Sequence, residues 1–376
     1  MKRNVAWSMT ALAGLYFVNT ALSAALAPRY AEIVDSLDLS TDELAWALLG
    51  QAIGLTAIIL TVAPRLADRY GARAVARLGA ISFCVLTPLI GIANSWAMLF
   101  AAFLASGAVN ALLDLGMARS ATDAEKQTGR TLITYLDIPA AVGSLLGATA
   151  GAAAAGRSDI GAYAMAIGLA GLFIVVAVWR LLPAPHREPA HTPVCAQGVP
   201  VAALCALAAA GLGMQLAVLD WASLVFRDLG APPTMYGLGH VTFLVGAALV
   251  LVACGPLADR YGGPTVLRVA AAIGIAGMAV ATVSDSITVV AIGMGLAGVG
   301  LQPAHPLALS AAGRGSVKDQ ARVIAASYVG MAVMRPAVGG LAGLVGIQAA
   351  LGLVTIFLGV VVLALSRAVQ KTRQHV

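Results

Sequence analysis

Two charged residues lie deep inside long apolar stretches of the sequence, where a charge is costly. Asp137 occurs within ITYLDIPAAVGS and Arg335 within MAVMRPAVGG. A charge at the centre of a membrane-spanning helix costs at least about 2.5 kcal/mol, so it normally faces a partner or a water-filled cavity. An aspartate there can carry a proton or a cation, and an arginine can bind an anionic substrate or balance an aspartate of the protein. Both residues are predicted to be functional, and their direct pairing stays open.

Polar residues at helical spacing add further candidates. Asn110 and Asp114 are four residues apart and therefore share one face of a helix. Asp114 is about one turn from the inner end of its apolar run, so it is either a ligand group or a carboxylate that reaches water. His305 could titrate near neutral pH, although a lone histidine on an apolar helix is more often hydrogen-bonded within the protein.

The composition places these residues in a protein that lies in lipid. Of the 376 residues, 60% are hydrophobic and 11% are charged, and the mean hydropathy is +0.89. A water-soluble domain has about 25% charged residues, so a soluble enzyme is disfavoured. An apolar run of about 20 residues crosses the roughly 30 Å of hydrocarbon in a bilayer. Twelve such runs are predicted as membrane-spanning helices, near residues 5–27, 42–64, 74–92, 96–118, 130–156, 160–182, 200–227, 235–256, 264–284, 287–312, 320–344 and 346–366.

A polar stretch, RLLPAPHREPAHTPVCAQGVP, divides the twelve runs into two sets of six. The sequence therefore predicts an all-α membrane protein with an N-terminal six-helix bundle over 1–182, a cytoplasmic linker over 183–199, and a C-terminal bundle with a short tail over 200–376. The first run follows MKR and contains ALSAALA, so it also has the form of a cleavable signal peptide. A retained helix is preferred, because removal would leave an odd number of helices.

Basic residues predict the orientation of these helices. With both termini inside, the inner segments hold nineteen of the 23 Lys and Arg residues. The first outer loop instead carries acidic residues, namely Glu32, Asp35, Asp38, Asp42 and Glu43. An excess of Lys and Arg marks cytoplasmic loops. Both termini are therefore predicted to be cytoplasmic, and the net charge of +6 needs no nucleic-acid partner.

One charged hexapeptide, LADRYG, occurs twice, at Leu66–Gly71 and again 191 positions later at Leu257–Gly262. Each copy falls in the short inner loop after the second helix of its six-helix half. A turn this short needs a glycine with positive φ, the role expected of Gly71 and Gly262. The repeat indicates a duplicated six-helix unit.

The two loops resemble the signature of the major facilitator superfamily, G-x-L-A-D-R/K-x-G-R/K-R/K. The first copy reads PRLADRYGAR and lacks the leading glycine, and the second reads GPLADRYGGP and lacks both trailing basic residues. The resemblance covers the whole chain through helix count, duplication and loop position. It implies twelve helices in two pseudo-symmetric six-helix bundles that alternate access to a site at the bilayer midplane.

The resemblance also implies a gating role for the two loops. In the family this cluster latches the two halves together on the inner side, and Asp68 and Asp259 inherit that role. The alternative is that these charges are solvated topology signals. The predicted gating residues are Asp68, Arg69, Gly71, Arg73, Asp259, Arg260 and Gly262.

By the same resemblance, polar residues on the first, fourth, seventh and tenth helices are expected to face the cavity. Together with the two intramembrane charges, the predicted substrate-binding or coupling residues are Asn19, Asn110, Asp114, Asp137, Gln215, Gln302, His305 and Arg335. Asp220 is instead expected at the outer interface, because it lies beside Trp221, whose indole favours that position.

Two residue patterns that many members of this superfamily use for proton coupling or export are absent from this sequence. The arginine that many proton-coupled members carry on the fourth helix falls here at Phe103, and the fifth helix lacks the Gly-Pro pair of the exporters. If protons drive transport, Asp137, Asp114 or His305 must carry them. Arg335 favours an anionic group on the substrate, so Arg335→Ala is expected to abolish transport or binding and to leave insertion intact.

The resulting hypothesis is a secondary transporter of the bacterial inner membrane that moves a small organic solute. The sequence has no GxxxxGK[ST] motif for ATP. Proton-coupled export of a drug-like or secreted metabolite is preferred, with uptake of a sugar or organic anion as the alternative and a non-transporting membrane sensor as an alternative of another class. No span carries the clustered acids of a membrane enzyme, and no cofactor or metal is expected. The expected partners are the solute, a proton or other coupling ion and the lipid bilayer, and the chain is expected to be a monomer.

Overall fold

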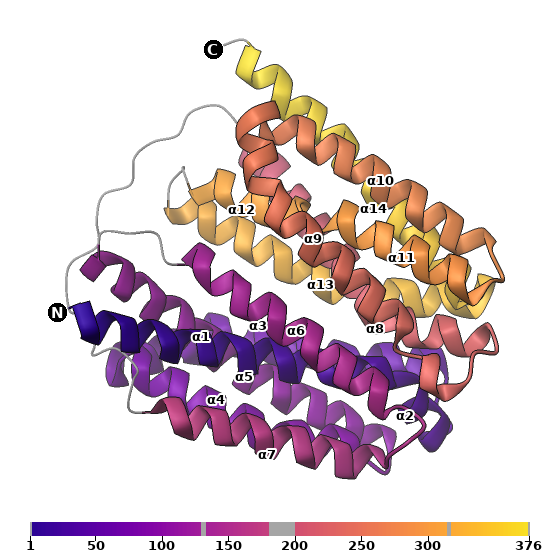
Figure 1. The fold of residues 1–376 in the computed structure, drawn as a ribbon, viewed down its shortest axis with the longest axis horizontal. Coiled ribbons are helices and arrows are strands. Elements are labelled where there is room, and N and C mark those ends of the chain that lie inside the picture. Colours follow the sequence, from indigo (N-terminus) through magenta and orange to yellow (C-terminus); the bar gives the residue numbers. More distant parts are fainter. Residues whose placement is uncertain (1, 129–132, 180–199, 314–316, 375–376) are drawn as a thin grey trace. The chain divides into compact units, whose positions relative to one another are not determined.

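The computed structural model describes residues 2–128, 133–179, 200–313 and 317–374. These residues form two compact units, an N-terminal unit within Met1–Pro189 and a C-terminal unit within Ala190–Val376 (Figure 1). The predicted linker over 183–199 lies outside the described residues. Within the described ranges, twelve helical segments are long and apolar enough to cross a membrane, which confirms the predicted helical membrane fold.

The N-terminal unit contains seven α-helices and one short 3-10 helix among its described residues. They are α1 (Lys2–Ala25), η1 (Ala27–Arg29), α2 (Tyr30–Leu37), α3 (Thr41–Tyr70), α4 (Ala72–Gly91), α5 (Trp96–Thr128), α6 (Ile133–Ala154) and α7 (Ile160–Val178). The segment expected as an acidic outer loop is therefore partly helical, because α2 occupies its first half.

Among the described residues, the C-terminal unit follows a similar order, without a counterpart of α2 and with a break between α11 and α12. Its described helices are α8 (Val201–Asp228), η3 (Pro233–Met235), α9 (Leu238–Tyr261), α10 (Gly263–Val283), α11 (Ile287–Leu301), α12 (Ala304–Gly313), α13 (Val317–Val345) and α14 (Ile347–Gln374). The span predicted as continuous over 287–312 is interrupted between α11 and α12. Pro303 and Pro306 explain the interruption, because a proline lacks the N–H that continues the hydrogen-bond ladder.

Local signals set the ends of α3. Its N-cap, Ser40, accepts a hydrogen bond from the backbone N–H of Glu43, and the Glu43 carboxylate accepts one from the Ser40 N–H at 2.8 Å. This reciprocal capping box satisfies two donors of the first turn. At the other end Gly71 has φ +86°, and Gly262 has φ +82° in the equivalent turn after α9. The glycines predicted to make both loop turns therefore do so.

Small residues let α1 and α6 cross closely in the N-terminal unit. An added Cβ on Gly143, Gly147 or Gly151 of α6 would contact the backbone carbonyl oxygen of an α1 residue. Those carbonyl oxygens belong to Phe17, Ala21 and Ala25. Small residues at this spacing allow helix backbones to approach within a membrane. This crossing fixes α1, which carries Asn19, in the core of its unit.

Candidate functional site

The N-terminal unit brings together two of the predicted site residues. Asn19 of α1 donates a hydrogen bond from Nδ2 to Oδ1 of Asp114 on α5 at 2.8 Å. Asn19 is buried and Asp114 is half-buried. Among the described residues no basic side chain forms an ion pair with Asp114, whereas Asp68 on the neighbouring helix has one with Arg119. The carboxylate of Asp114 is therefore held within a membrane span by a neutral amide.

Asn110 completes this cluster, which we term the α1–α5 polar group (Asn19, Asn110 and Asp114). Asn110 lies one turn before Asp114 on the same face of α5. Its Oδ1 atom and the Oδ1 atom of Asn19 are both buried without a hydrogen-bond partner. Buried polar atoms nearly always bond to protein, water or a ligand. The group therefore offers two amide acceptors and one carboxylate to water or to a bound solute.

The C-terminal unit assembles a second cluster at the interruption between α11 and α12. Gln215 of α8 donates from Nε2 to the carbonyl oxygens of Leu301 and Gln302, each at 3.3 Å. Pro306 cannot supply the N–H that would bond to the Gln302 carbonyl in a continuous helix. Irregular backbone at membrane depth is tolerated where other groups satisfy it or where it lines a cavity. Gln215 thus replaces part of the missing helical hydrogen bonding.

His305 follows the interruption and is half-buried. Its backbone nitrogen lies against Gly211 of α8, where an added Cβ would be 2.7 Å away. We term Gln215, Gln302 and His305 the helix-break group. The predicted residues Gln215 and Gln302 therefore meet in the structure, and His305 follows three residues later on α12. Discontinuous helices of this kind often form solute sites in transporters.

Loss of the Gln215 amide should destabilise the helix break. Gln215→Met keeps the side-chain length but leaves two buried carbonyl oxygens without this donor, and an unsatisfied buried group costs about 1–3 kcal/mol. A lower melting temperature of the purified protein in detergent is expected. Leu219→Met, one turn further along α8, is the control and should change stability by less than about 1.5 kcal/mol. Equal melting temperatures for Gln215→Met and wild type would show that the amide contributes nothing.

Arg335 has a partner within its own unit. Its Nε atom donates to Oδ2 of Asp220 at 2.7 Å, and Arg335 and Asp220 are only 3% and 4% exposed. Asp220 and the neighbouring Trp221 are both buried inside the unit, whereas a carboxylate at the interface was expected to reach water. A buried carboxylate already neutralises Arg335. This pair differs from Asp114, whose hydrogen-bond partner is uncharged.

Asp137 occupies a different environment. Its side chain is exposed at the surface of the N-terminal unit, near the start of α6. One turn later, the carbonyl of Ala140 accepts a hydrogen bond from Thr20 Oγ1 at 2.7 Å, which links α6 to α1. Asp137 is not part of the α1–α5 polar group as the structure stands. Its predicted coupling role stays a prediction.

The first predicted gating loop has a defined ion pair. Asp68 accepts a hydrogen bond from Arg119 of α5 at 2.7 Å, and both side chains are substantially exposed. Arg69 and Arg260 each lie over the adjacent tyrosine ring at 5.3 Å, so the two copies of the hexapeptide share this local contact. Arg73 is half-buried. The side chain of Asp259 lies outside the described set, and the latch between halves stays a prediction.

Some polar residues escaped sequence reasoning. His240 of α9 is 1% exposed, and neither ring nitrogen has a hydrogen-bond partner. Arg119, the partner of Asp68, was visible only as one of many basic residues near an inner helix end. The signals were weak because a histidine at the start of an apolar run and an arginine at its end are both common. Within the described ranges, no three His, Cys, Asp or Glu side chains gather as metal ligands would.

Comparison with known proteins gives consistent matches. The family model described as Major Facilitator Superfamily matches residues 12–204. An uncharacterised transporter of Sinorhizobium fredii is 28% identical over 282 residues, covering 73% of this chain and 74% of that protein. An uncharacterised MFS-type transporter of Yersinia pestis is 26% identical over 316 residues, covering 81% of each.

Solved structures share the fold at low sequence identity. A bacterial homologue of the human lysosomal transporter Spinster, in an inward-facing and occupied conformation, has a TM-score of 0.75 at 15% identity. The match covers 98% of this chain and 97% of that chain. The nucleoside transporter NupG has a TM-score of 0.71 at 12% identity, with 97% and 99% covered. At such identities the likeness concerns the fold alone.

Proposed function

The chain belongs to the major facilitator superfamily of membrane transporters, and from this premise we propose that it exports a small organic solute in exchange for protons. The observation that carries the proposal is the environment of Asp114. Its carboxylate lies within a membrane span and is hydrogen-bonded to the neutral amide of Asn19. A carboxylate without a fixed countercharge can gain and lose a proton as its surroundings open to water on one side and then the other.

The contrast with Asp220 supports this choice of proton carrier. Asp220 is held by the guanidinium of Arg335 at 2.7 Å, and an adjacent cation favours the charged form of a carboxylate. Protonating Asp220 would leave a buried arginine unpaired, which is costly. Asp220 is therefore assigned a structural role, and Asp114 the coupling role. Asp137 and His305 remain secondary candidates.

The solute is proposed to be neutral or cationic with an apolar body. Arg335, the residue expected to bind an anion, is occupied by Asp220. The α1–α5 polar group presents oxygen acceptors, and the carbonyls of Leu301 and Gln302 end a helix, where the backbone dipole is negative. Oxygen acceptors favour a solute that carries N–H or O–H donors. The alternative, uptake of a sugar or organic anion, has less support from these contacts.

The two units are proposed to rock about a midplane site in the way general for this class of transporter. The loops that carry Asp68, Arg69, Gly71 and Arg73, and Asp259, Arg260 and Gly262, are proposed to gate the cytoplasmic side. We place the chain in the bacterial inner membrane as a monomer with both termini cytoplasmic. The excess of Lys and Arg in the segments assigned to the cytoplasm supports this orientation.

The test begins with the solute. Thermal stabilisation of the purified protein across lipophilic amines, nucleosides, sugars and organic acids identifies a compound that binds the folded state. Transport of that compound is then measured in proteoliposomes. An antiporter accumulates the solute when the lumen is acidic, whereas a symporter accumulates it when the outside is acidic. Accumulation with an acidic lumen is expected.

Asp114→Asn should separate coupling from solute binding. The amide keeps the size and one hydrogen bond but cannot carry a proton, so gradient-driven accumulation should fall to background while solute exchange continues. Asp42→Asn, which alters an exposed carboxylate at the start of α3, should transport normally. Gradient-driven accumulation by Asp114→Asn at the wild-type rate would refute Asp114 as the proton carrier.

A further inference from the structure

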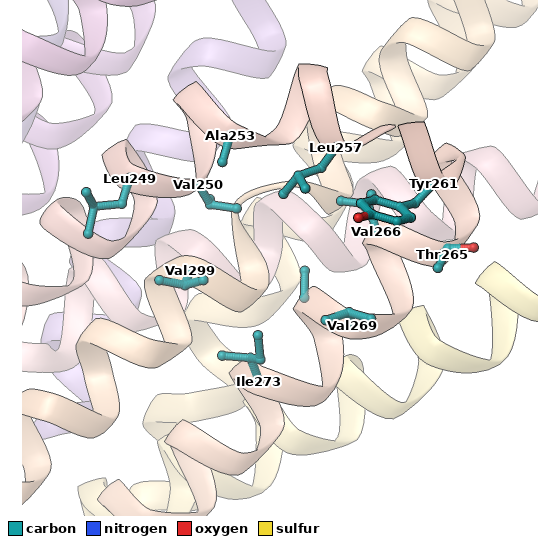
Figure 2. Close-up of a pocket in the computed structure, with 11 residues that line it drawn as sticks. Leu249, Val250, Ala253, Leu257, Tyr261, Thr265, Val266, Val269, Ile273 and Val299 are labelled. Carbon is teal, nitrogen blue, oxygen red and sulfur yellow. The ribbon is translucent and has the colours of Figure 1, made fainter. Parts of the chain in front are cut away.

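An apolar groove runs between α9 and α10 of the C-terminal unit, with Val299 of α11 at its base (Figure 2). Its volume is about 490 Å³. The walls are aliphatic from Leu249 to Leu257, and polar atoms enter only at one end, from Tyr261 and Thr265. Figure 2 shows these two residues together at the end of the groove where α9 passes into α10. The groove therefore has an apolar body and one polar end.

This groove differs from a solute site at the interface of the two repeats, because all its lining residues belong to one unit. Its dimensions match a lipid leaflet instead. Tyr261 lies twelve positions after Leu249 on α9, which is about 18 Å at the α-helical rise. One leaflet contributes half of a hydrocarbon core of about 30 Å. A single acyl chain that lies along α9 would fill such a groove.

Two arginines surround the polar end. Arg268 of α10 lies one turn from Thr265, to whose Oγ1 atom it donates a hydrogen bond at 3.3 Å. Arg260 of α9 lies with its guanidinium carbon 5.3 Å from the ring centroid of Tyr261. Tyrosine and arginine at the end of a membrane helix typically lie at the level of the lipid headgroups. Basic pockets between membrane helices bind anionic headgroups.

The N-terminal unit provides an internal comparison, because the same loop occurs 191 residues earlier. Arg77 lies 191 positions before Arg268, but its guanidinium donates to the carbonyl of Trp179 and stacks on that ring at 4.6 Å. Arg268 makes no such contact outside α10 among the described residues. The arginine of the N-terminal copy is thus occupied by the protein, whereas its C-terminal counterpart is available to a phosphate.

The residues beside the loop also differ between the two units. In the N-terminal unit Leu112 of α5 packs with Ala63, Ala67 and Val75. Pro303, at the interruption after α11, is 191 positions after Leu112 and therefore occupies the equivalent position in the C-terminal copy. The C-terminal copy therefore has a proline at the position where the N-terminal copy has a leucine that packs against α3 and α4.

We propose that the α9–α10 groove binds one acyl chain of an anionic phospholipid, with its phosphate against Arg268 and Arg260. The aliphatic walls account for the chain, and the two arginines account for the charge of the headgroup. This inference does not depend on the solute or on the direction of transport.

Native mass spectrometry tests the proposal. The protein is placed in nanodiscs of equal parts phosphatidylglycerol and phosphatidylcholine, and the lipid that it retains on release is identified. Wild type is expected to retain one phosphatidylglycerol and little phosphatidylcholine. Ala253→Trp places a ring in the groove and should abolish retention. The matched control is Val252→Trp at the adjacent residue, which is 81% exposed and does not line the groove. It should retain the lipid as wild type does.

Arg268→Gln tests the headgroup contact separately. Loss of one basic residue near an anionic lipid should weaken phosphatidylglycerol binding about fivefold and leave phosphatidylcholine unchanged. Because this residue is partly exposed, the variant also decides the question if Ala253→Trp fails to fold. The proposal is overturned if Ala253→Trp folds and retains the lipid, if wild type shows no preference between the two lipids, or if Arg268→Gln binds phosphatidylglycerol as wild type does.

Discussion

Arg335→Ala is expected to destabilise the C-terminal unit by about 3–5 kcal/mol, because it leaves the carboxylate of Asp220 buried without its partner. The two side chains are 4% and 6% exposed and 2.7 Å apart, so water cannot replace the lost guanidinium cheaply. The two residues are 115 positions apart in the chain, and their contact joins α8 to α13. The measurement is the unfolding of the purified protein in detergent, followed by heat or denaturant.

A double variant separates loss of the pair from loss of arginine itself. Asp220→Asn alone should also destabilise, because it leaves Arg335 without a countercharge. Asp220→Asn combined with Arg335→Gln removes both charges and should recover part of the loss, since neutral replacement of a buried pair is far less costly than breaking it. If Arg335→Ala unfolds as wild type does but no longer binds the solute, Arg335 is a substrate-binding residue and the structural assignment fails.

That expected result reverses the one drawn from the sequence, and the reason is physical. Depth in the membrane was judged for Asp220 from its neighbour Trp221, an aromatic residue typical of the interface. In the structure Trp221 is fully buried, so its indole packs inside the protein instead of facing water or lipid headgroups. A single sequence gives the position of each charge along its own helix, but it does not say which helices face each other. The sequence showed that the charge of Arg335 lies at a costly depth, but it did not identify Asp220 as the partner of that charge.

The helices themselves were predictable because length and apolarity decide which segments cross a bilayer. The glycine turns after α3 and α9 were also predictable, since each lies in a short loop between helices. The interruption between α11 and α12 was missed although Pro303 and Pro306 signal it. An apolar run hides a broken helix, because hydrophobicity is unchanged where the hydrogen-bond ladder stops.

The residues of the candidate site were chosen from the sequence, and helical periodicity indicated only part of their arrangement. Asn110 and Asp114 share a face by helical periodicity alone. The hydrogen bond from Asn19 to Asp114 joins residues 95 positions apart, so it depends on how α1 packs against α5. Asp137 met the same criteria of charge and depth but lies exposed on α6. Periodicity identifies a face of a helix, whereas packing decides what that face meets.

Gly107→Ala should cost about 3 kcal/mol, which is a large effect for one added methyl group. Its Cβ would contact the backbone carbonyl of Gln51 and lie 2.8 Å from the carbonyl carbon. Backbone cannot rotate away as a side chain can, so α3 and α5 must separate. Gly298 makes the same approach to Phe243 in the C-terminal unit, and Gly298→Ala should be comparably costly. The measurement is thermal unfolding in detergent.

Gly340→Ala is the matched control. Gly340 lies within α13, is exposed, and an added Cβ would meet nothing within 4 Å. Alanine is the better helix former, so this variant should gain about 0.5–1 kcal/mol. Gly107 lies about one turn before Asn110, and moving α5 away from α3 would also displace Asp114 from Asn19. Gly107→Ala should therefore lose proton coupling as well as stability. A stable Gly107→Ala protein with normal coupling would show that the α3–α5 contact does not position Asp114.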